Sequence, residues 1–503
     1  MDKLKILIAA SEVVPFAKSG GLADVVGALP KALRKLGHDV RVVMPRYYIV
    51  DREKYGLKPM KGSLGVPMGV IGEEWAGVYE GVLPGSDVPI YFIEHERYFG
   101  RKGLYDENGI AFSDNDNRFI FLSRAAMQLA KKLHFQPDII HANDWHTAAM
   151  PIFLNTVYAL DPDFAGTASV LSIHNLQHQG QFYKGAMDVL GVGWEHFTAD
   201  ELEEYDGINL LKGGIVHSNA INAVSQKYAD EIRTSEFGWG LEGLISHHGT
   251  KLFGILNGVD YEEWSPAIDP LIPFNYDINS MAGKKICKLE LQKTFNLPHR
   301  QDVPLIGLVG RLADQKGISL LAEAMGGLME MDIQIVLLGA GEKWAEEFFS
   351  HIASTYPDKF GTYIGYRNDL AHQIEAGSDF FLMPSLFEPC GLNQIYSLRY
   401  GTLPIVRATG GLDDTIENYQ PYTGKGDGFK FYEASAEALY GTVKWAVDTY
   451  TNDKKGIKKL IKNAMKKQFS WEVAAQSYEE MYRYSLRQRF GISVDSADYM
   501  ERN

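Results

Sequence analysis

The sequence predicts an α/β protein built from two doubly wound, Rossmann-like domains of mostly parallel strands. Three observations lead to this fold class. Short apolar runs rich in β-branched residues alternate with stretches of helical periodicity. This alternation occurs twice, before and after a proline-containing segment at residues 259–273 that has little periodicity of its own. The chain of 503 residues is also longer than one hydrophobic core usually serves.

In the first predicted domain, residues 1–258, strands are expected at the short apolar runs and helices at the periodic stretches between them. The expected strands are Lys5–Ala10, Val40–Met44, Pro89–Glu94, Asp138–His141, Ser169–His174, Ala220–Val224 and Leu252–Leu256. Helices are expected at Ala23–Leu36 and Arg118–Leu133. This order is typical of consecutive βαβ units.

The second predicted domain, residues 259–470, repeats the pattern after the connector. Its expected strands are Pro304–Val309, Ile333–Leu338, Thr362–Ile364, Phe380–Met383 and Leu403–Val406, and its helices Gly317–Met331, Trp344–Thr355, Asp369–Ala376 and Asn393–Tyr400. Residues 471–503 form a third part, in which Trp471–Arg489 predicts a helix that could pack on either domain. Ligands of such sheets bind outside the carboxyl ends of the strands, so we expect a site in an interdomain cleft that can close.

Composition and charge disfavour several classes of protein. The apolar share of 45% and the charged share of 23% are those of an ordinary soluble protein. A net charge of −14 argues against binding to nucleic acid or to anionic membranes. Only Cys287 and Cys390 are present, which fits a reducing compartment better than a disulfide framework. With no visible secretory signal and no apolar stretch long enough to span a bilayer, we expect a cytoplasmic protein. The lysines between 454 and 467 have helical spacing and predict a solvated helix face.

The first motif, Lys18-Ser19-Gly20-Gly21-Leu22-Ala23-Asp24, joins the first strand to the first helix. Adjacent glycines at such a turn let backbone N–H groups approach a ligand, and the start of the following helix stabilises an anion. Lys18 adds a full positive charge. The alternative is an ordinary tight turn with a surface lysine, and the glycines alone favour that alternative.

The second motif is Val309–Gly317, after the first strand of the second domain. Arg311 and Lys316 place a guanidinium and an ammonium five residues apart on one loop at the ligand-binding edge of the sheet. Two such cations suit a diphosphate, which can accept two hydrogen bonds from Arg and pair with Lys as a point charge. The alternative is a solvated loop held by a salt bridge to Asp314.

The third motif, Pro384–Asn393, lies between a strand and a helix. Gly391, Leu392 and Asn393 would present backbone N–H donors at the start of that helix. Glu388 would accept hydrogen bonds from sugar hydroxyls, a geometry that an apolar group cannot reproduce. The alternative for Glu388 is a favourable charge near a helix N-terminus, which stabilises by only about 0.3–1 kcal/mol.

Three histidines and one aspartate also end strands of the first domain, in His141-Ala142-Asn143-Asp144-Trp145-His146 and Ser172-Ile173-His174-Asn175. They raise the possibility of a metal site. The i,i+4 helical spacing of a zinc motif is absent, however, so we expect no metal there and a hydrogen-bonded structural role for His141.

Taken together, these motifs resemble those of the bacterial and plant glycogen/starch synthases, the retaining glycosyltransferase family 5. The resemblance extends from Lys5 to about Tyr484. Its most specific parts are Lys18–Asp24 after Ser11-Glu12, Asp144-Trp145-His146, His174-Asn175, Asn257-Gly258-Val259-Asp260, Gly310-Arg311-Leu312 with Lys316-Gly317, and Phe387–Leu392 followed by Tyr400–Pro404.

The resemblance implies the glycosyltransferase-B fold and a role for each site residue. In the second domain, Arg311 and Lys316 would neutralise the nucleotide diphosphate, Tyr366 would stack on the base and Glu388 would hold glucose hydroxyls. Leu392 and Asn393 would donate to the phosphate beside Gly391, with Cys390 packed in the same loop. In the first domain, the phosphates and ribose would be approached by Lys18, Ser19, Gly20, Gly21 and Asp24. His174 and Asn257 would contact the glucosyl unit. Asp144 would lie near the transferring glucose or the acceptor. Tyr396 occupies the position at which many relatives carry a second glutamate, so the ribose contact stays unassigned. Trp471–Arg489 would cross back onto the first domain.

The function expected from the resemblance is transfer of glucose from ADP-glucose to the non-reducing end of an α-1,4-glucan with retention of configuration. Retention can proceed by double displacement, for which Asp144 is the nearest candidate nucleophile, or by same-face substitution assisted by the leaving phosphate. The cationic residues favour the second route, and no metal or other cofactor is expected.

Alternatives stay open at the level of sequence. They are UDP-glucose as donor, a sucrose or trehalose-phosphate synthase of the same fold, a catalytically silent glucan-binding protein, and a metal hydrolase using the strand-end histidines. A silent binder would have no need to keep Lys18, Arg311, Lys316 and Glu388 together. The sequence carries no signal for a particular oligomeric state.

Overall fold

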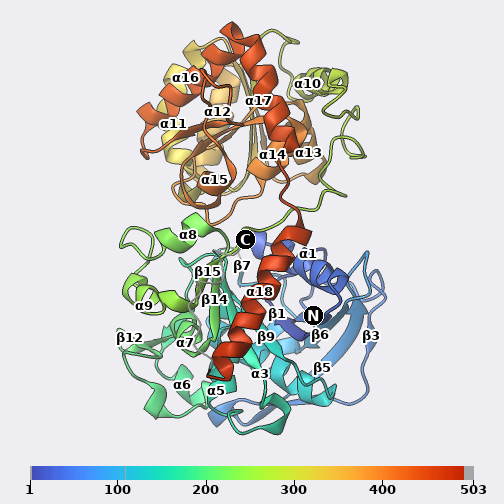
Figure 1. Ribbon diagram of the computed structural model, residues 1–503, viewed down its shortest axis with the longest axis vertical. Coiled ribbons are helices and arrows are strands. Elements are labelled where there is room, and N and C mark those ends of the chain that lie inside the picture. Colours follow the sequence, from blue (N-terminus) through green and yellow to red (C-terminus); the bar gives the residue numbers. More distant parts are fainter. Residues whose placement is uncertain (1–2, 108, 492–503) are drawn as a thin grey trace. The chain divides into compact units, whose positions relative to one another are not determined.

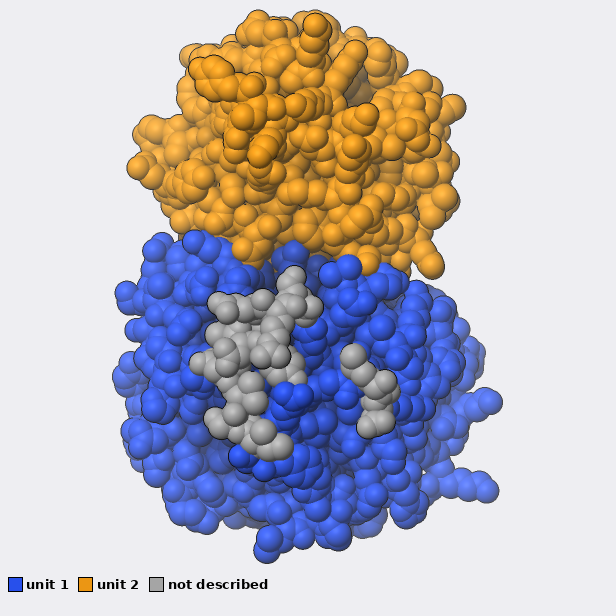
Figure 2. All heavy atoms as spheres, in the orientation of Figure 1, with its two compact units in different colours: residues 1–258, 471–503 blue, residues 259–470 orange. Residues whose placement is uncertain are grey.

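The structure, a computed structural model, describes residues 3–107 and 109–491. The chain divides into two compact units (Figures 1 and 2). Unit 1 contains the described residues up to Gly258 together with those from Trp471 onward, and unit 2 is Val259–Ser470. Each unit has a sheet of parallel strands connected by helices, so the predicted doubly wound α/β architecture is confirmed. Within the described part of the chain, none of the helices combines the length and apolar character that a bilayer span requires.

The main sheet of unit 1 has the strand order β15-β14-β10-β9-β1-β2-β6-β5-β3, with β4 also paired to β5. From β15 to β6 all neighbours are parallel, whereas β5 is antiparallel to its neighbours. The strands are β1 (Lys5–Ala9), β2 (Asp39–Pro45), β3 (Lys58–Pro59), β4 (Leu64–Pro67), β5 (Glu73–Val82), β6 (Pro89–Glu94), β9 (Ile139–Asn143), β10 (Ala168–Ile173), β14 (Ala220–Ala223) and β15 (Leu252–Gly254).

Helices and two small antiparallel sheets complete unit 1. The helices are α1 (Gly21–Lys35), α2 (Glu96–Phe99), α3 (Asn115–Lys132), α4 (Asp144–Thr147), α5 (Ala149–Asn155), α6 (Ala186–Leu190), α7 (Leu210–His217), α8 (Gln226–Glu231), α9 (Glu242–His247) and α18 (Trp471–Arg489). The small sheets pair β7 (Asp106–Glu107) with β8 (Ile110–Ala111), and β11 (Gln181–Tyr183) with β13 (Gly207–Asn209) and β12 (Glu203–Glu204).

Helix α18 is part of the core of unit 1. It packs against α1, β10 and β14 (Figure 1, red). The Tyr482 hydroxyl lies 2.9 Å from Nδ1 of His141, and the Tyr478 hydroxyl accepts a 2.9 Å hydrogen bond from Nδ2 of Asn222. All four side chains are fully buried. The end of the described chain therefore completes a unit that begins with β1.

Unit 2 has one wholly parallel sheet in the order β18-β17-β16-β19-β20-β21. Its strands are β16 (Leu305–Val309), β17 (Gln334–Gly339), β18 (Phe360–Ile364), β19 (Phe380–Met383), β20 (Leu403–Arg407) and β21 (Phe429–Phe431). Its helices are α10 (Ala282–Thr294), α11 (Ile318–Glu330), α12 (Lys343–Thr355), α13 (Asn368–Gly377), α14 (Asn393–Tyr400), α15 (Gly410–Thr415), α16 (Ala436–Asn452) and α17 (Lys454–Lys466).

The lysine-rich stretch is helix α17, as the sequence predicts. Its buried residues are Ile457, Leu460, Ala464 and Met465, while the lysines at 455, 458, 459, 462 and 466 are exposed. The helix therefore packs by one apolar stripe and keeps its charged face in solvent, where like charges are screened.

Parallel strands bring distant loops of each unit together. Since neighbouring parallel strands end at the same edge of a sheet, the loops after β1, β9 and β10 gather at one edge in unit 1. By the same rule, the loops after β16, β18, β19 and β20 gather at one edge in unit 2. The candidate residues that follow these strands are Lys18, Asp144, His174, Arg311, Lys316, Tyr366 and Glu388.

Candidate active site

The loop after β1 is organised by a buried carboxylate, Glu12. Its Oε2 accepts hydrogen bonds from the backbone N–H groups of Ser19 and Gly20, and its Oε1 accepts from the Ser19 hydroxyl at 2.6 Å and from the Tyr105 hydroxyl at 2.5 Å. Glu12 is only 4% exposed. Two of the backbone donors that the sequence offers to an anion are thus occupied within the protein. No role was predicted for Glu12 from the sequence, although a glutamate three residues after a buried strand was an available signal.

Lys18 and Asp24, at the two ends of this motif, contact each other. The Lys18 Nζ lies 2.7 Å from Oδ1 of Asp24. Lys18 is half exposed, whereas burial, as the largest cause, raises the pKa of the Asp24 carboxyl. A ligand anion could draw the Lys18 ammonium away from Asp24, because a lysine side chain is long and flexible.

Asp144 and His174 meet at the ends of β9 and β10. The Asp144 Oδ1 accepts a 2.7 Å hydrogen bond from the backbone N–H of His174 and a longer one from Asn175. Asp144 has φ of 51°, a left-handed conformation that non-glycine residues adopt mainly where the surroundings impose it. Burial raises the pKa of its carboxyl to about 7.

His174 is held as a neutral imidazole. Its Nε2 lies 2.9 Å from Oδ1 of Asn143, and burial lowers its pKa to about 3. A neutral ring placed in this way can donate or accept a hydrogen bond with a sugar hydroxyl without adding charge. The two residues that the resemblance assigns to the transferring sugar therefore lie next to each other.

The other two strand-end histidines serve the structure of unit 1. Both ring nitrogens of His141 have partners, the Tyr482 hydroxyl at 2.9 Å and the Ser172 hydroxyl at 2.7 Å. The His146 ring lies 4.2 Å from the ring of Trp145 and 4.7 Å from that of Tyr105. The hydrogen-bonded role expected for His141 is confirmed. Neither histidine belongs to a metal-binding group among the described residues.

Asn257 lies at the end of unit 1 and is 5% exposed. Its side-chain Oδ1 is buried and has no hydrogen-bond partner among the described residues. A buried amide oxygen without a partner costs about 1–3 kcal/mol, so such an atom in a native protein calls for a ligand or a water. A sugar hydroxyl would supply the missing donor.

In unit 2, Lys316 and Glu388 form an ion pair between the loops that follow β16 and β19. The Lys316 Nζ lies 2.6 Å from Oε2 of Glu388, which also accepts a 3.0 Å hydrogen bond from the Ser385 hydroxyl. The Glu388 side chain is 8% exposed and that of Lys316 is 27% exposed. The predicted cation and the predicted hydroxyl acceptor are therefore brought into contact.

Arg311 is exposed in the same loop and contacts Gln315, with 3.2 Å between Nη2 and Oε1. The salt bridge to Asp314 that was considered as an alternative is not found among the described residues, where Asp314 accepts a 2.7 Å hydrogen bond from the Ser319 hydroxyl. No ion pair of Arg311 is found among the residues that the structure describes. Its guanidinium can thus turn towards an anionic ligand.

The same two loops are fixed to each other by backbone contacts. The N–H of Leu386 donates to the carbonyl of Gln315 at 2.9 Å. Gly317 has φ of 70°, and a Cβ atom built on it would lie 1.9 Å from the carbonyl oxygen of Pro384. Only glycine permits this approach of the two backbones, which keeps Lys316 beside Glu388.

The start of helix α14 follows directly. Gly391 has φ of 71°, Leu392 is the N-cap residue, and the Asn393 Nδ2 donates to the Val309 carbonyl at 3.1 Å, which ties the helix to the end of β16. Cys390 is buried and forms no disulfide with a described residue. The N–H groups of Ile395 and Tyr396 donate to the Leu392 carbonyl, which leaves those of Asn393 and Gln394 as the ones that could donate to an anion at this sheet edge.

Tyr366 and Tyr396 differ in their surroundings. Tyr366, after β18, is 70% exposed, and its hydroxyl donates to Oδ1 of Asn368 at 3.1 Å. Tyr396 is 9% exposed and stacks on Trp264 at 3.9 Å with an interplanar angle of 5°. The exposed ring is able to stack on a ligand, whereas Tyr396 fills the interior of unit 2.

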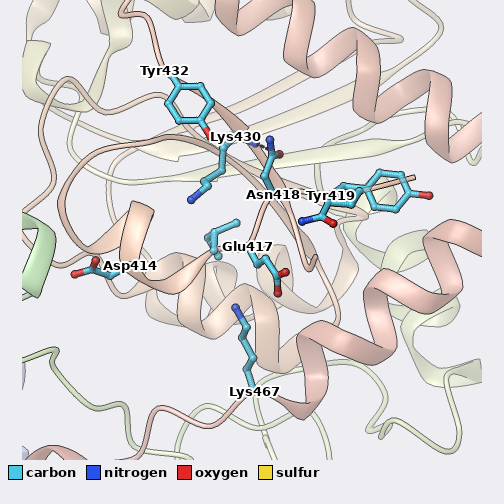
Figure 3. A pocket seen from close by; sticks show the side chains of 9 residues that line it. Asp414, Glu417, Asn418, Tyr419, Lys430, Tyr432 and Lys467 are labelled. Carbon is cyan, nitrogen blue, oxygen red and sulfur yellow. Dashed lines mark hydrogen bonds between the residues drawn. The ribbon is translucent and has the colours of Figure 1, made fainter. Parts of the chain in front are cut away.

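A cavity of about 390 Å³ lies elsewhere in unit 2. Figure 3 shows its lining side chains, which come from the segment after α15, from β21 and from the ends of elements nearby. The lining residues are Asp414, Ile416, Glu417, Asn418, Tyr419, Gln420, Lys430, Tyr432 and Lys467. None of the site residues predicted from the sequence lines this cavity, so it does not define the candidate site.

The raised pKa of Asp144 predicts how the stability of unit 1 depends on pH. Between its ordinary value near 3.8 and about 7, the folded state binds the proton more tightly than the unfolded state, so the free energy of unfolding falls as pH rises through this window. About three pKa units correspond to at most ~4 kcal/mol. Asp144→Asn removes the charge, keeps a carbonyl acceptor and tolerates the left-handed backbone. We expect the thermal midpoint of the variant to rise relative to the wild type between pH 5 and pH 8. A difference between variant and wild type that is constant with pH would contradict this account.

Comparison with known proteins matches the two units to two families. Residues 5–247 match the starch synthase catalytic domain, and residues 291–467 match the group 1 glycosyl transferases. The chain is 32% identical, with a TM-score of 0.89, to the catalytic domain of starch synthase IV from Arabidopsis thaliana bound to ADP and acarbose, covering 96% of this chain and 100% of that one. This likeness confirms the glycosyltransferase-B type of fold. Sucrose-phosphate synthase from Thermosynechococcus elongatus, with 16% identity and a TM-score of 0.58 over 98% of this chain and 100% of that one, shares the fold alone.

Two bacterial proteins resemble this chain over nearly its whole length. Glycogen synthase 1 of Geobacter metallireducens is 60% identical over 491 residues, which cover 98% of each chain. Glycogen synthase of Treponema denticola is 45% identical over 97% of this chain and 99% of its own. Because identity at this level extends over nearly the whole of both units, the chain belongs to the glycogen synthase family, a family of glycosyltransferases that carries the starch synthase catalytic domain.

Proposed function

We propose that this protein transfers glucose from ADP-glucose to the non-reducing end of an α-1,4-glucan with retention of the α configuration. Unit 2 would bind the nucleotide sugar and unit 1 the acceptor and the transferring sugar. The observation that carries the proposal is the Lys316–Glu388 pair, with Arg311 on the same loop. These residues combine cations that can bind a diphosphate with a carboxylate that can bind sugar hydroxyls. A nucleotide sugar carries both of these groups.

The proposed reaction is a same-face substitution. The bond between the anomeric carbon and the phosphate oxygen breaks, the acceptor oxygen forms its bond to that carbon from the same face, and the acceptor proton passes to the departing phosphate. Charge develops on the leaving diphosphate, and fixed cations and helix N-termini stabilise it there. Lys316, Arg311 and the start of α14 are the groups that this chain offers for that purpose.

The surroundings of Asp144 support this route over double displacement. Its Oδ1 already accepts two backbone N–H groups, and its pKa of about 7 leaves much of the carboxyl protonated at neutral pH. A protonated carboxyl is a poor nucleophile. With permanent charges supplied by Arg311 and Lys316, the reaction is proposed to require neither a metal ion nor another cofactor.

Two observations support ADP-glucose, an adenine nucleotide sugar, as the proposed donor. The Arabidopsis starch synthase IV structure is described as bound to ADP. The motifs of this chain also resemble the bacterial synthases. Tyr366 is the residue proposed to stack on the base, and its 70% exposed ring has a free face for that purpose. The proposed compartment is the cytoplasm, which fits two buried cysteines that form no disulfide with each other.

The test is to incubate the purified protein with glycogen and labelled ADP-glucose or UDP-glucose, with chelator present, and to measure label in polymer. We expect incorporation from ADP-glucose, unaffected by chelator, and release of the label by α-amylase if the new bonds are α-1,4. Incorporation from UDP-glucose alone would overturn the choice of ADP-glucose as donor, while the proposed glucose transfer itself would stand. Label in polymer from neither donor, with glycogen still bound, would favour a silent glucan-binding protein.

A further inference from the structure

We propose that His196, Glu201 and His217 form a structural binding site for a zinc-type divalent cation in unit 1. Among the described residues, this is the one group of three or more His, Cys, Asp or Glu side chains whose ligand atoms converge closely enough to share an ion. It lies outside the site assigned to the transferase reaction and includes none of the histidines that end β9 and β10. The proposal does not depend on the proposed function.

The three ligand atoms have distances that a small divalent ion requires. The Glu201 Oε2 lies 2.6 Å from Nδ1 of His196 and 3.3 Å from Nε2 of His217, and all three atoms lie within 4.8 Å of one another. Zinc binds nitrogen and oxygen at about 2.0–2.1 Å, so tetrahedral ligands lie about 3.3 Å apart. The contact with His217 already has this length, and the contact with His196 needs to open by less than about 1 Å.

The residue types select the class of metal. Two imidazoles and one carboxylate suit zinc and neighbouring first-row metals, whereas calcium and magnesium prefer oxygen ligands. The side chains are 23%, 29% and 10% exposed for His196, Glu201 and His217, so an ion can enter from solvent and keep a water as fourth ligand.

The backbone holds the three side chains in place. His196 ends a single 3-10 turn, Trp194–His196. The Thr198 carbonyl accepts from the N–H groups of both Glu201 and Glu203 at 3.0 Å, which fixes the next turn. His217 is the last residue of α7, and its carbonyl accepts a 2.7 Å hydrogen bond from Nδ2 of Asn155. The three metal ligands thus come from three segments that hydrogen bonds hold in place, which lowers the entropic cost of binding an ion.

An ion at this position would clamp the ends of one segment. Between Glu201 and His217 lie β12, β13 and α7. The Asn209 Nδ2 donates to Oε1 of Gln179 at 2.7 Å, and the N–H of Leu211 donates to the Gln179 carbonyl at 3.0 Å. These contacts attach the segment to the loop that follows β10 and His174. The expected role of the ion is therefore to stabilise this part of unit 1.

A metal-free arrangement, in which both histidines simply hydrogen-bond to Glu201, can be distinguished by matched substitutions. Asn at 196 and Gln at 217 place an amide N–H where Nδ1 and Nε2 stand, so His196→Asn with His217→Gln keeps both donors to Glu201. Amides are poor ligands for zinc. The double variant therefore removes metal binding while it preserves the hydrogen bonds, and Glu201→Gln is a second, independent variant.

The experiment uses untagged full-length protein. Zinc is added, excess ion is removed by gel filtration, and bound metal is measured by mass spectrometry. Cobalt is added separately to look for the intense visible bands of four-coordinate Co²⁺. We expect about one metal per chain, a thermal midpoint that rises with zinc, and a loss of affinity of about 100-fold or more in the double variant and in Glu201→Gln. His247→Asn, an exposed histidine on α9, is the control and should bind as the wild type does.

Two results would overturn the proposal. The first is a wild-type protein that retains no zinc after gel filtration and gives no four-coordinate cobalt spectrum. The second is metal binding that the double variant and Glu201→Gln leave unchanged, because the ion would then lie elsewhere. Neither result bears on glucose transfer, which is measured separately with chelator present.

Discussion

Lys316→Ala is expected to lower kcat for glucose transfer by about 100- to 1,000-fold, the effect of removing one group that stabilises developing charge in a transition state. The loss should appear in kcat as well as in kcat/KM, since the proposed role is to stabilise the leaving diphosphate. Steady-state rates of label incorporation at saturating donor would measure it. Unchanged turnover with only a weaker affinity for the donor would contradict this role.

The same substitution has a structural effect that must be separated from the catalytic one. Without the Lys316 ammonium, the 8% exposed Glu388 carboxylate keeps the Ser385 hydroxyl but loses its cation. An uncompensated buried charge destabilises by about 3–5 kcal/mol. The double variant Lys316→Ala with Glu388→Gln should recover much of this stability without recovering kcat. Lys343→Ala, whose exposed side chain pairs with Glu347, is the control that should change neither.

Gly317→Ala is expected to lower the free energy of unfolding of unit 2 by about 2–4 kcal/mol. The new Cβ would lie 1.9 Å from the Pro384 carbonyl oxygen, and a φ of 70° is itself unfavourable for alanine. Neither strain can be relieved without moving the loop that carries Lys316 away from the loop that carries Glu388. A shift of about 1 Å between such groups can reduce turnover by about 100-fold.

Gly310→Ala is the matched control in the same loop. A Cβ atom at this position would have no atom within 4 Å, and its φ is not in the left-handed region. Thermal unfolding and transfer rates of the two variants should therefore diverge, with Gly310→Ala remaining close to the wild type in stability. Equal loss of stability in both variants would show that the close approach to Pro384 is not the cause.

Most of the parallel strands of both sheets could be predicted because strands buried on both faces appear as continuous apolar runs. The three-residue edge strand β21, which is parallel to β20, was not predicted. The bounds of β6, β19, α14 and α18 agree with the sequence prediction to the residue. The long strand β5 was not predicted. Its sequence, Glu73–Val82, contains two glycines and three glutamates, and only Ala76 and Val78 are buried. The strand pairs antiparallel to β6 beyond the parallel strands. Pairing with β6 therefore stabilises a strand that the β-propensity of its own residues does not predict.

The candidate site could be predicted in part for the same reason. Residues that follow parallel strands gather at one sheet edge, so Lys316 and Glu388 could be expected to approach each other. Sequence spacing does not specify side-chain positions, so it could not predict three features of the site. These are the ion pair itself, the hydrogen bonds from the Ser19 and Gly20 N–H groups to Glu12, and the Asn257 oxygen that has no partner among the described residues. The stacking of Tyr366 on a base stays a prediction, because its exposed ring is compatible with that role without requiring it.

The placement of α18 in unit 1 has a consequence for synthesis of the chain. A ribosome releases the N-terminus first, so every strand of unit 1 emerges before any part of unit 2, yet the helix carrying Tyr478 and Tyr482 emerges last. Until then His141 and Asn222 lack their tyrosine hydroxyl partners, and the surface of β10 and β14 that α18 covers is exposed. Unit 2, an uninterrupted stretch of chain, can fold without α18, whereas unit 1 cannot be completed until α18 has emerged. A released chain truncated after Ser470 should therefore protect unit 2 from proteases and leave unit 1 susceptible.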